Sequence, residues 1–288
     1  MLLPKISGRV MRMATHTTPG TEYVLGRTLG EHHRLNRQGR LISAITRHFL
    51  AKVGLAPGMR VLDVGSGTGD VALFAARAVG PSGLVVCVDA DSAAMAIGRE
   101  RADHAGLKNI LFHACDFYRY QPSIAFDAVL GRCVLLHQTK PVAALEAVLK
   151  YLRSGGIVAF QEPWFSRAFS CPEAPLFQEM LGWLHGTLVA SGFDGDIGVR
   201  LPSLYASAGL PRPNLSFEML VDCGAESEVY DFCIDTVRSL LPRIEELNIS
   251  TPERIGLDTL AARLRAEASA FETVIGVMPL MGAWSKSP

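Results

Sequence analysis

The sequence predicts a doubly wound α/β fold with a mostly parallel sheet, from two observations. Apolar strand-like runs alternate with helical runs: strands over 59–64, 84–89, 109–114, 126–130 and 156–161, and helices over 70–79, 92–105 and 138–152. Such alternation indicates a parallel sheet covered by helices on both faces. A glycine-rich turn also follows the first strand, in VLDVGSGTGD (61–70). In open α/β sheets, ligands bind outside the carboxyl ends of the strands.

The segments flanking this core complete the predicted domain organisation. Residues 1–18 contain Pro, Gly, Ser and Thr without apolar periodicity, which predicts a disordered leader. Residues 19–55 predict one or two helices, because Leu35, Ile45 and Phe49 recur at helical spacing. The core spans 56–162, and we expect trimming to Thr18 to leave stability and ligand affinity unchanged.

The last part of the chain, 163–288, breaks the alternation. It predicts helices near 174–191, 201–210, 226–247 and 256–270, with strands near 214–221 and in TVIGVMP (273–279). These two strands bring the expected sheet to seven. We interpret 163–288 as a helical cap insertion plus completion of the sheet, forming one domain with the core.

Composition excludes several functional classes. The 288 residues carry zero formal net charge and no Lys/Arg run, which argues against nucleic-acid binding. No run of about 18 apolar residues predicts a membrane span, and the first residues lack the long apolar segment of a signal peptide. The six cysteines form no C-x-x-C pair and no His/Cys cluster suggests a metal, so we expect reduced thiols, no metal and a cytoplasmic protein.

The glycine turn carries the strongest ligand signal. Gly65, Gly67 and Gly69 fall at alternate positions, with Asp63 two residues before the first of them. Asp89 ends a second apolar run about 20 residues further on, where a carboxylate that accepts ribose hydroxyls is expected. The turn departs from the dinucleotide fingerprint G-x-G-x-x-G, because position 70 is aspartate.

This constellation resembles the class I S-adenosylmethionine-dependent methyltransferases over residues 55–162. It is most similar to the ubiquinone/menaquinone-biosynthesis C-methyltransferase type and to small-molecule methyltransferases of secondary metabolism. The resemblance implies a Rossmann-like core, S-adenosylmethionine (SAM) as cofactor and S-adenosylhomocysteine (SAH) as product. It also implies that the N-terminal helices form a lid over the cofactor, with Tyr23 and Arg34 facing inward.

The resemblance assigns further cofactor positions after successive strands. Asp116 would accept the adenine amino group and Phe117 would flank the ring, although Asp116 can equally cap the following turn. Met95 would lie on the adenine face, although a core methionine fits that position as well. Arg132 follows the fourth strand near the expected sulfonium, and charge repulsion predicts that its side chain turns away while its backbone faces the cofactor.

Three residues are candidate general bases: His137 after the fourth strand, Glu162 after the fifth, and His185 on the expected cap helix. A histidine held by a local hydrogen bond is the alternative for His137. A base is needed only for a weakly acidic acceptor such as a phenol. In-line methyl transfer to carbon or to a neutral amine requires positioning above all.

The expected substrate is a small apolar, aromatic molecule, such as an indole- or quinol-like natural product. The basis is a set of aromatic residues in the cap, namely Trp164, Phe165, Phe169, Phe177, Trp183 and Phe193. The acceptor atom (C, N or O) and the oligomeric state stay open. Two rival classes are a nicotinamide-dependent oxidoreductase, against which Asp70 and Asp116 count, and a non-catalytic interaction protein with a large apolar patch.

Overall fold

The computed structural model describes residues 29–288. The expected leader over 1–18 and the inward-facing role of Tyr23 concern residues outside this range, so both stay predictions. Residues 19–55 were expected to form one or two helices, and the described part forms two, α1 (Leu29–Leu41) and α2 (Ser43–Val53).

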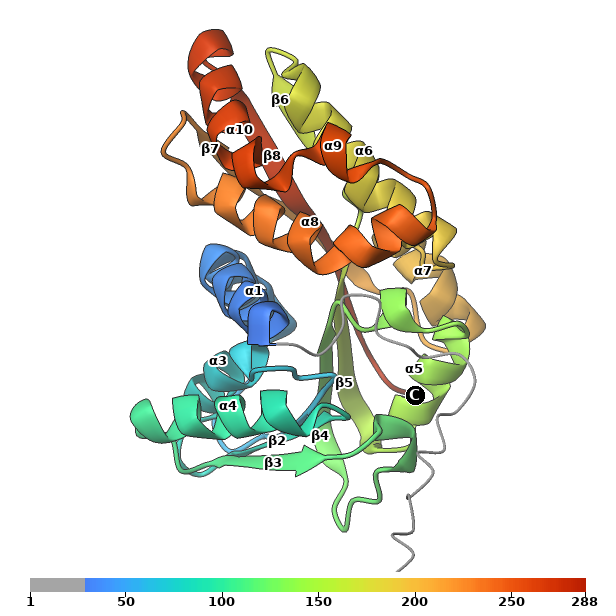
Figure 1. Cartoon of the computed structure of the whole chain (residues 1–288). Coiled ribbons are helices and arrows are strands. Elements are labelled where there is room, and N and C mark those ends of the chain that lie inside the picture. The colour runs from blue at the N-terminus through green and yellow to red at the C-terminus, as the bar shows by residue number, and fades with distance from the viewer. Residues whose placement is uncertain (1–28) are drawn as a thin grey trace, which may run out of the picture.

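A single sheet runs through the molecule, with the strand order β3-β2-β1-β4-β5-β8 (Figure 1). The first five strands pair in parallel, whereas β8 is antiparallel to β5. The parallel strands are β1 (Arg60–Val64), β2 (Leu84–Asp89), β3 (Ile110–Ala114), β4 (Phe126–Arg132) and β5 (Leu152–Pro163). The remaining three are β6 (Phe169–Cys171), β7 (Asn214–Cys223) and β8 (Val274–Lys286). The predicted doubly wound, Rossmann-like arrangement is confirmed.

The expected seven strands become eight, because β6 pairs with the first residues of β8. The strand β8 is also longer than the predicted 273–279 and continues through Pro279, although proline cannot donate a ladder hydrogen bond. The structure accommodates Pro279 at an irregularity: Met278 has a φ of 49°, and the pairing of β7 with β8 shifts register between Glu218 and Leu220. Beyond that point β8 continues along β5.

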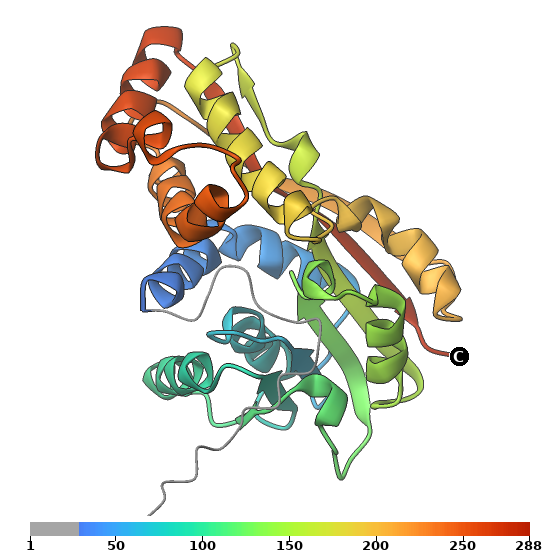
Figure 2. The same ribbon diagram turned by 45° about the vertical axis from the view of Figure 1, so that its right-hand side comes forward.

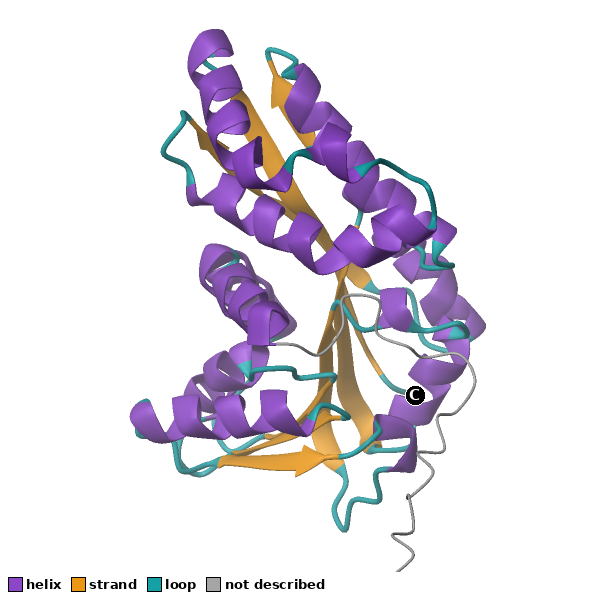
Figure 3. Ribbon diagram, viewed as in Figure 1, coloured by secondary structure: helices purple, strands orange, loops and turns teal. Residues whose placement is uncertain are grey.

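Helices cover both faces of the sheet (Figure 3). One face is covered by α2, α3 (Asp70–Val79) and α4 (Ser92–His104), and the other by α5 (Pro141–Leu149) and α7 (Ile197–Ser207). The cap helices, a name used here for α6 (Pro175–Ala190), α8 (Glu228–Glu246), α9 (Pro252–Ile255) and α10 (Leu257–Phe271), lie beyond the strand ends. No helix of the described residues combines the length and apolar character needed to cross a bilayer.

The predicted helix over 138–152 is shorter than expected. The helix α5 begins at Pro141, because the preceding residues form a separate 3₁₀ turn, η2 (Leu135–His137). Two similar turns, η1 (Phe117–Arg119) and η3 (Phe165–Arg167), follow β3 and β5. All three turns lie where strands end, and each contributes a residue to the cavity described below.

The apolar core divides into three clusters: one on each face of the central sheet and a third in the cap. The third cluster contains Ile42 and Ile45 of the N-terminal segment together with residues of α6, α8, α10 and β8. The helix α1 therefore lies between the cap helices and the glycine-loop side of the sheet (Figure 2). Between these parts the carboxyl ends of the parallel strands face the cap.

Candidate functional site

A cavity of about 340 Å³ lies at the carboxyl ends of the strands and has two chemically different walls. The strand-end wall consists of residues 65–68, 70, 89–91, 94, 116–118, 132–134 and 136–138. The cap wall consists of Phe165, Ala168, Leu181, Leu184, His185, Leu188, Phe232, Cys233, Thr236, Leu240, Val277 and Met278. Arg34, Leu35 and Gln38 of α1 complete the lining.

The glycine loop is fixed by backbone bonds and by one carboxylate. Gly65 and Gly67 have φ values of 59° and 52°, in the left-handed region that favours glycine. The Gly65 N–H donates to the Val88 carbonyl at 2.8 Å. Asp89 accepts from the Gly67 N–H at 2.9 Å and from the Asp91 N–H at 2.8 Å. Asp89 thus joins the loop after β1 to the end of β2.

The turn after β3 forms the next part of this wall. Asp116 accepts from the Tyr118 N–H at 2.9 Å, and it also lines the cavity, so the capping and cavity interpretations of Asp116 are compatible. The rings of Phe117 and Tyr118 stack with centroids 4.3 Å apart. The Tyr118 hydroxyl donates to Gln138 at 3.0 Å, which links this turn to the segment after β4.

Arg132, at the end of β4, belongs to a buried ion cluster. Its guanidinium lies 3.1 Å from one oxygen of Asp70 and donates to the Thr46 hydroxyl at 2.7 Å. Arg101 lies 2.7 Å from the other Asp70 oxygen. A Cβ on Gly39 of α1 would lie 2.1 Å from that carboxylate, so only glycine allows α1 to approach it this closely. The guanidinium of Arg132 therefore points toward Asp70 and Thr46, and both Arg132 and Asp70 line the cavity, so charge repulsion does not exclude Arg132 from the site as the sequence analysis expected.

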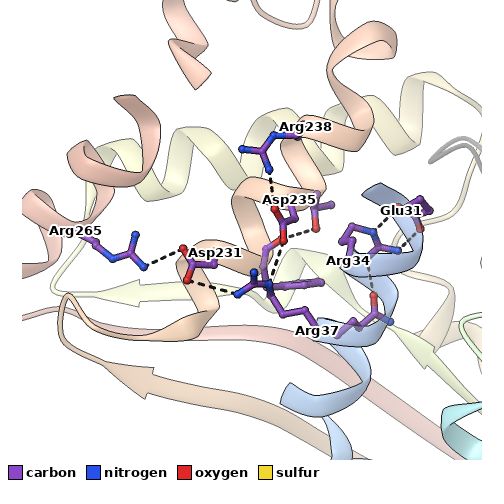
Figure 4. Close-up of polar contacts among 10 residues, drawn as sticks. Glu31, Arg34, Arg37, Asp231, Asp235, Arg238 and Arg265 are labelled. Carbon is purple, nitrogen blue, oxygen red and sulfur yellow. Dashed lines mark hydrogen bonds and ion pairs between the residues drawn. The ribbon is translucent and has the colours of Figure 1, made fainter. Parts of the chain in front are cut away.

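The helix α1 contacts α8 of the cap through charged side chains (Figure 4). Arg34 is buried, donates to both Glu31 oxygens at 2.6 and 2.7 Å and to Gln38 at 2.7 Å, and lies 5.9 Å from the centre of the Phe232 ring. One turn further on, Arg37 lies 3.1 Å from Asp235 of α8. The predicted inward position of Arg34 agrees with this geometry.

The two candidate histidines both line the cavity. Burial, with a contribution from the Arg34 charge, lowers the pKa of His137 to about 4, so His137 is neutral at pH 7. Its ring packs edge-on against Phe193 at 5.6 Å. His185 of α6 is about one third exposed and lies 4.0 Å from Asp196.

Glu162 has a structural position that does not fit the predicted role of base. It is fully buried and absent from the cavity lining, and its carboxylate accepts from the backbone N–H groups of Val134, Leu135 and Leu136 at 2.9, 2.9 and 3.2 Å. Burial raises the pKa of Glu162 to about 7 despite these three bonds, which favour the ionised form. Glu162 therefore holds the turn after β4 in place.

Three predicted cofactor residues also lie outside the lining. Asp63 is buried beneath the glycine loop, and burial raises its pKa to about 8. Gly69 precedes α3 with a φ of 84°, in the left-handed region, so the backbone turn itself favours glycine there. Met95 is buried in the core cluster on that face, which favours the core interpretation, and its neighbour Ala94 lines the cavity instead.

The cap wall differs most from expectation. Of the six aromatic residues predicted to surround the substrate, only Phe165 lines the cavity, because Phe177 and Trp183 pack inside the cap and Trp164 packs edge-on against Phe217. Aliphatic residues of α6 and the α8 residues Phe232, Cys233, Thr236 and Leu240 form this wall instead. The sequence analysis predicted a helix over 226–247, which is α8, but it did not assign that helix to the cavity.

Comparison with known proteins agrees with this site. Residues 55–186 match the family model described as a methyltransferase domain. The chain is similar to ubiquinone/menaquinone biosynthesis C-methyltransferases: 34% identical over 140 residues to that of Bordetella parapertussis and 35% over 115 residues to that of Cellvibrio japonicus. These alignments cover 47% and 38% of this chain and 53% and 46% of the relatives. The chain thus spans about half the length of the curated relatives it matches.

A solved structure from Bacillus halodurans C-125, assigned as a methyltransferase, has the same fold, with a TM-score of 0.55 and 16% identity over 84% of this chain and 98% of that one. Residues 55–186 therefore match a methyltransferase domain, and the chain shares the Rossmann-like fold of that structure. SAM is the cofactor that the match to methyltransferases supports. The site fits this cofactor: a Cβ built on Gly67 meets no atom within 4 Å, so the space before the loop is open, and Asp89 and Asp116 supply acceptors beside it.

Proposed function

We propose that this protein transfers the methyl group of SAM to a small, apolar, aromatic molecule such as a quinol or an indole. The observation that carries the proposal is the continuity of one cavity from the glycine loop to the cap wall. Bound SAM supplies an electrophilic methyl group. The strand-end residues hold the cofactor, and the cap wall holds the acceptor.

The cap wall supports an apolar acceptor. Leu181, Leu184, Leu188 and Leu240 present only hydrocarbon to the cavity, and binding sites of this composition favour ligands with few polar groups. Phe165 and Phe232 are the aromatic residues of this wall, so ring contacts are fewer than the sequence led us to expect. The similarity to quinone-pathway C-methyltransferases favours an electron-rich ring carbon as the acceptor atom.

We propose His137 as the base if the acceptor is a hydroxyl group. Its neutral ring at pH 7 can take a proton, although a pKa of about 4 makes it a weak base. His137→Ala should then lower turnover by about tenfold or more, a barrier increase of about 1.4 kcal/mol, while SAH affinity stays nearly constant. His185→Ala tests the other candidate base that lines the cavity, which is more exposed and lies on the cap. Wild-type turnover in a folded His137→Ala protein would favour catalysis by positioning alone.

The proposal is tested by supplying methyl-labelled SAM and a panel of quinols, phenols and indoles to the full chain, with products identified by mass spectrometry. Transfer of label to a ring carbon, nitrogen or oxygen would identify the acceptor atom. Thermal shifts with SAH and with NADH distinguish a methyltransferase from the alternative, a nicotinamide-dependent oxidoreductase. A ligand that binds only the folded protein raises the melting temperature of the protein. Stabilisation by NADH and not by SAH would overturn the proposal.

A further inference from the structure

The charges that line the strand-end wall change sign along the sheet. The strands follow the order β3-β2-β1-β4, so their carboxyl ends form a row. Asp116 follows β3, Asp89 and Asp91 follow β2, and all three line the cavity. Arg132 lines the cavity at the end of β4, on the opposite side of the glycine loop. One end of this wall is therefore acidic and the other basic.

The basic end carries an excess of positive charge. One carboxylate, that of Asp70, is shared by the guanidinium groups of Arg132 and Arg101, at 3.1 and 2.7 Å. Asp63 also lies within range of the Arg132 charge, but burial raises its pKa to about 8, so Asp63 is mainly protonated at pH 7. The Arg132 side chain is nine-tenths buried, where an uncompensated cation favours an anionic partner.

Arg34 is the other arginine of the lining, and its surroundings differ. Its guanidinium makes two bonds to a single carboxylate, that of Glu31, which is itself buried. Arg34 thus has a carboxylate that it approaches through two hydrogen bonds, whereas the Asp70 cluster holds two guanidinium groups against one carboxylate. The excess of positive charge thus lies at Arg132.

We propose that Arg132, held in position by Asp70, binds the carboxylate at the amino-acid end of SAM. The inference rests on the proposed function. The adenosine part of SAM offers hydroxyl and amino donors, which match the acids after β2 and β3, whereas its amino-acid end carries a carboxylate, which matches the cationic end of the row. The polarity of the wall then fixes the direction in which the cofactor lies across the glycine loop.

Ligand truncation tests this assignment without relying on turnover. 5′-Methylthioadenosine keeps the adenosine part of SAH and lacks the amino-acid end. Calorimetry with both ligands on the full-length wild-type chain and on Arg132→Gln should show a loss of about 10- to 100-fold for SAH. For methylthioadenosine the change should stay within about twofold, because Arg132 does not act on that part of the ligand.

Arg99→Gln is the matched control, since Arg99 lies on α4 as Arg101 does but donates to the Phe112 carbonyl and does not line the cavity. It should change the affinity for both ligands by about twofold or less. If Arg132→Gln does not fold, Arg132→Lys keeps the charge in the folded site but loses the planar fork, and a smaller loss for SAH alone is expected.

Equal losses for SAH and methylthioadenosine in Arg132→Gln, or no loss for either, would overturn the assignment, as would an Arg99→Gln variant that behaves in the same way as Arg132→Gln. A loss for SAH alone in Arg34→Met that Arg132→Gln lacks would assign the carboxylate to Arg34 instead. Failure of the wild-type chain to bind SAH at all would contradict the proposed function itself, which is a distinguishable result.

Discussion

The two walls of the cavity are built by different means. The strand-end wall uses short-range devices: left-handed glycines, carboxylates that accept neighbouring backbone N–H groups, and an acid or arginine at each strand end. The cap wall uses side chains from helices far apart in sequence, of which α6 and α8 contribute most. The polar groups of the site, which need precise positions, therefore lie at the ends of the sheet strands. The apolar surface of the site instead depends on how the cap helices pack.

Because the two walls are built differently, substitutions in one wall should affect different properties from substitutions in the other. Changes in the strand-end wall should act on cofactor affinity, and changes in the cap wall should act on stability and on the acceptor. The following predictions test that separation, beginning with the largest expected effect.

Leu240→Ala should have the largest effect on stability. Leu240 is 1% exposed within the cap cluster, and truncation of a buried leucine to alanine costs about 2–5 kcal/mol of unfolding free energy. Urea unfolding measures this loss, and calorimetry should find SAH affinity within about twofold of wild type. A large loss of SAH affinity in the folded variant would mean that the two walls are not independent.

Asp89→Ala should act mainly on SAH affinity, in contrast to Leu240→Ala, which should act mainly on stability. It removes the acceptor of the Gly67 and Asp91 N–H groups and the proposed acceptor of ribose hydroxyls. Loss of hydrogen bonds to a charged group costs about 1.5–3 kcal/mol, so SAH affinity should fall by about 10- to 100-fold. Calorimetry on Asp89→Ala and Asp89→Asn gives the measurement, and unchanged affinity in folded protein would remove Asp89 from the site.

The two buried acids predict a pH dependence of stability. Folding raises the pKa of Asp63 from 3.8 to about 8 and that of Glu162 from 4.5 to about 7. The folded state therefore binds more protons than the unfolded state, and stability falls as pH rises through these values. His137 opposes this trend only below its unfolded pKa of 6.5.

Between pH 6.5 and 8, the unfolding free energy should consequently decrease, by at most about 1.4 kcal/mol per pH unit for each group. Asp63→Asn should flatten the curve measured by urea unfolding at several pH values. A wild-type curve that rises over this interval would contradict the prediction.

Arg37→Met should have the smallest effect. Arg37 joins α1 to Asp235 and Asp231 of α8 through partly exposed ion pairs, which contribute about 0–1 kcal/mol and are screened by salt. The difference in melting temperature from wild type should shrink as the salt concentration rises. Arg238→Met is the comparison variant, because Arg238 pairs with Asp235 within α8 and does not reach α1. Equal effects of the two variants on SAH affinity would argue against α1 acting as a lid.

The sheet core and most of the strand-end wall could be predicted from the sequence alone. Gly65, Gly67, Asp89, Asp116 and Phe117 were predicted and line the cavity, because a residue that directly follows a parallel strand lies at the ligand-binding edge whatever the rest of the chain does. The positions of these residues depend on local geometry, which can be predicted from their distance in sequence from the end of a strand.

Residue spacing could not predict the contacts that depend on how distant elements pack together. Glu162 occupies a strand end as Asp89 does, yet its side chain points into the turn after β4, because which face of a strand meets the cavity depends on the neighbouring elements. The sharing of Asp70 between Arg101 and Arg132 joins residues of three elements that no local pattern connects. The cap wall likewise depends on how α6 and α8 pack, since an amphipathic helix shows which side chains are apolar but not which of them face a core or a ligand.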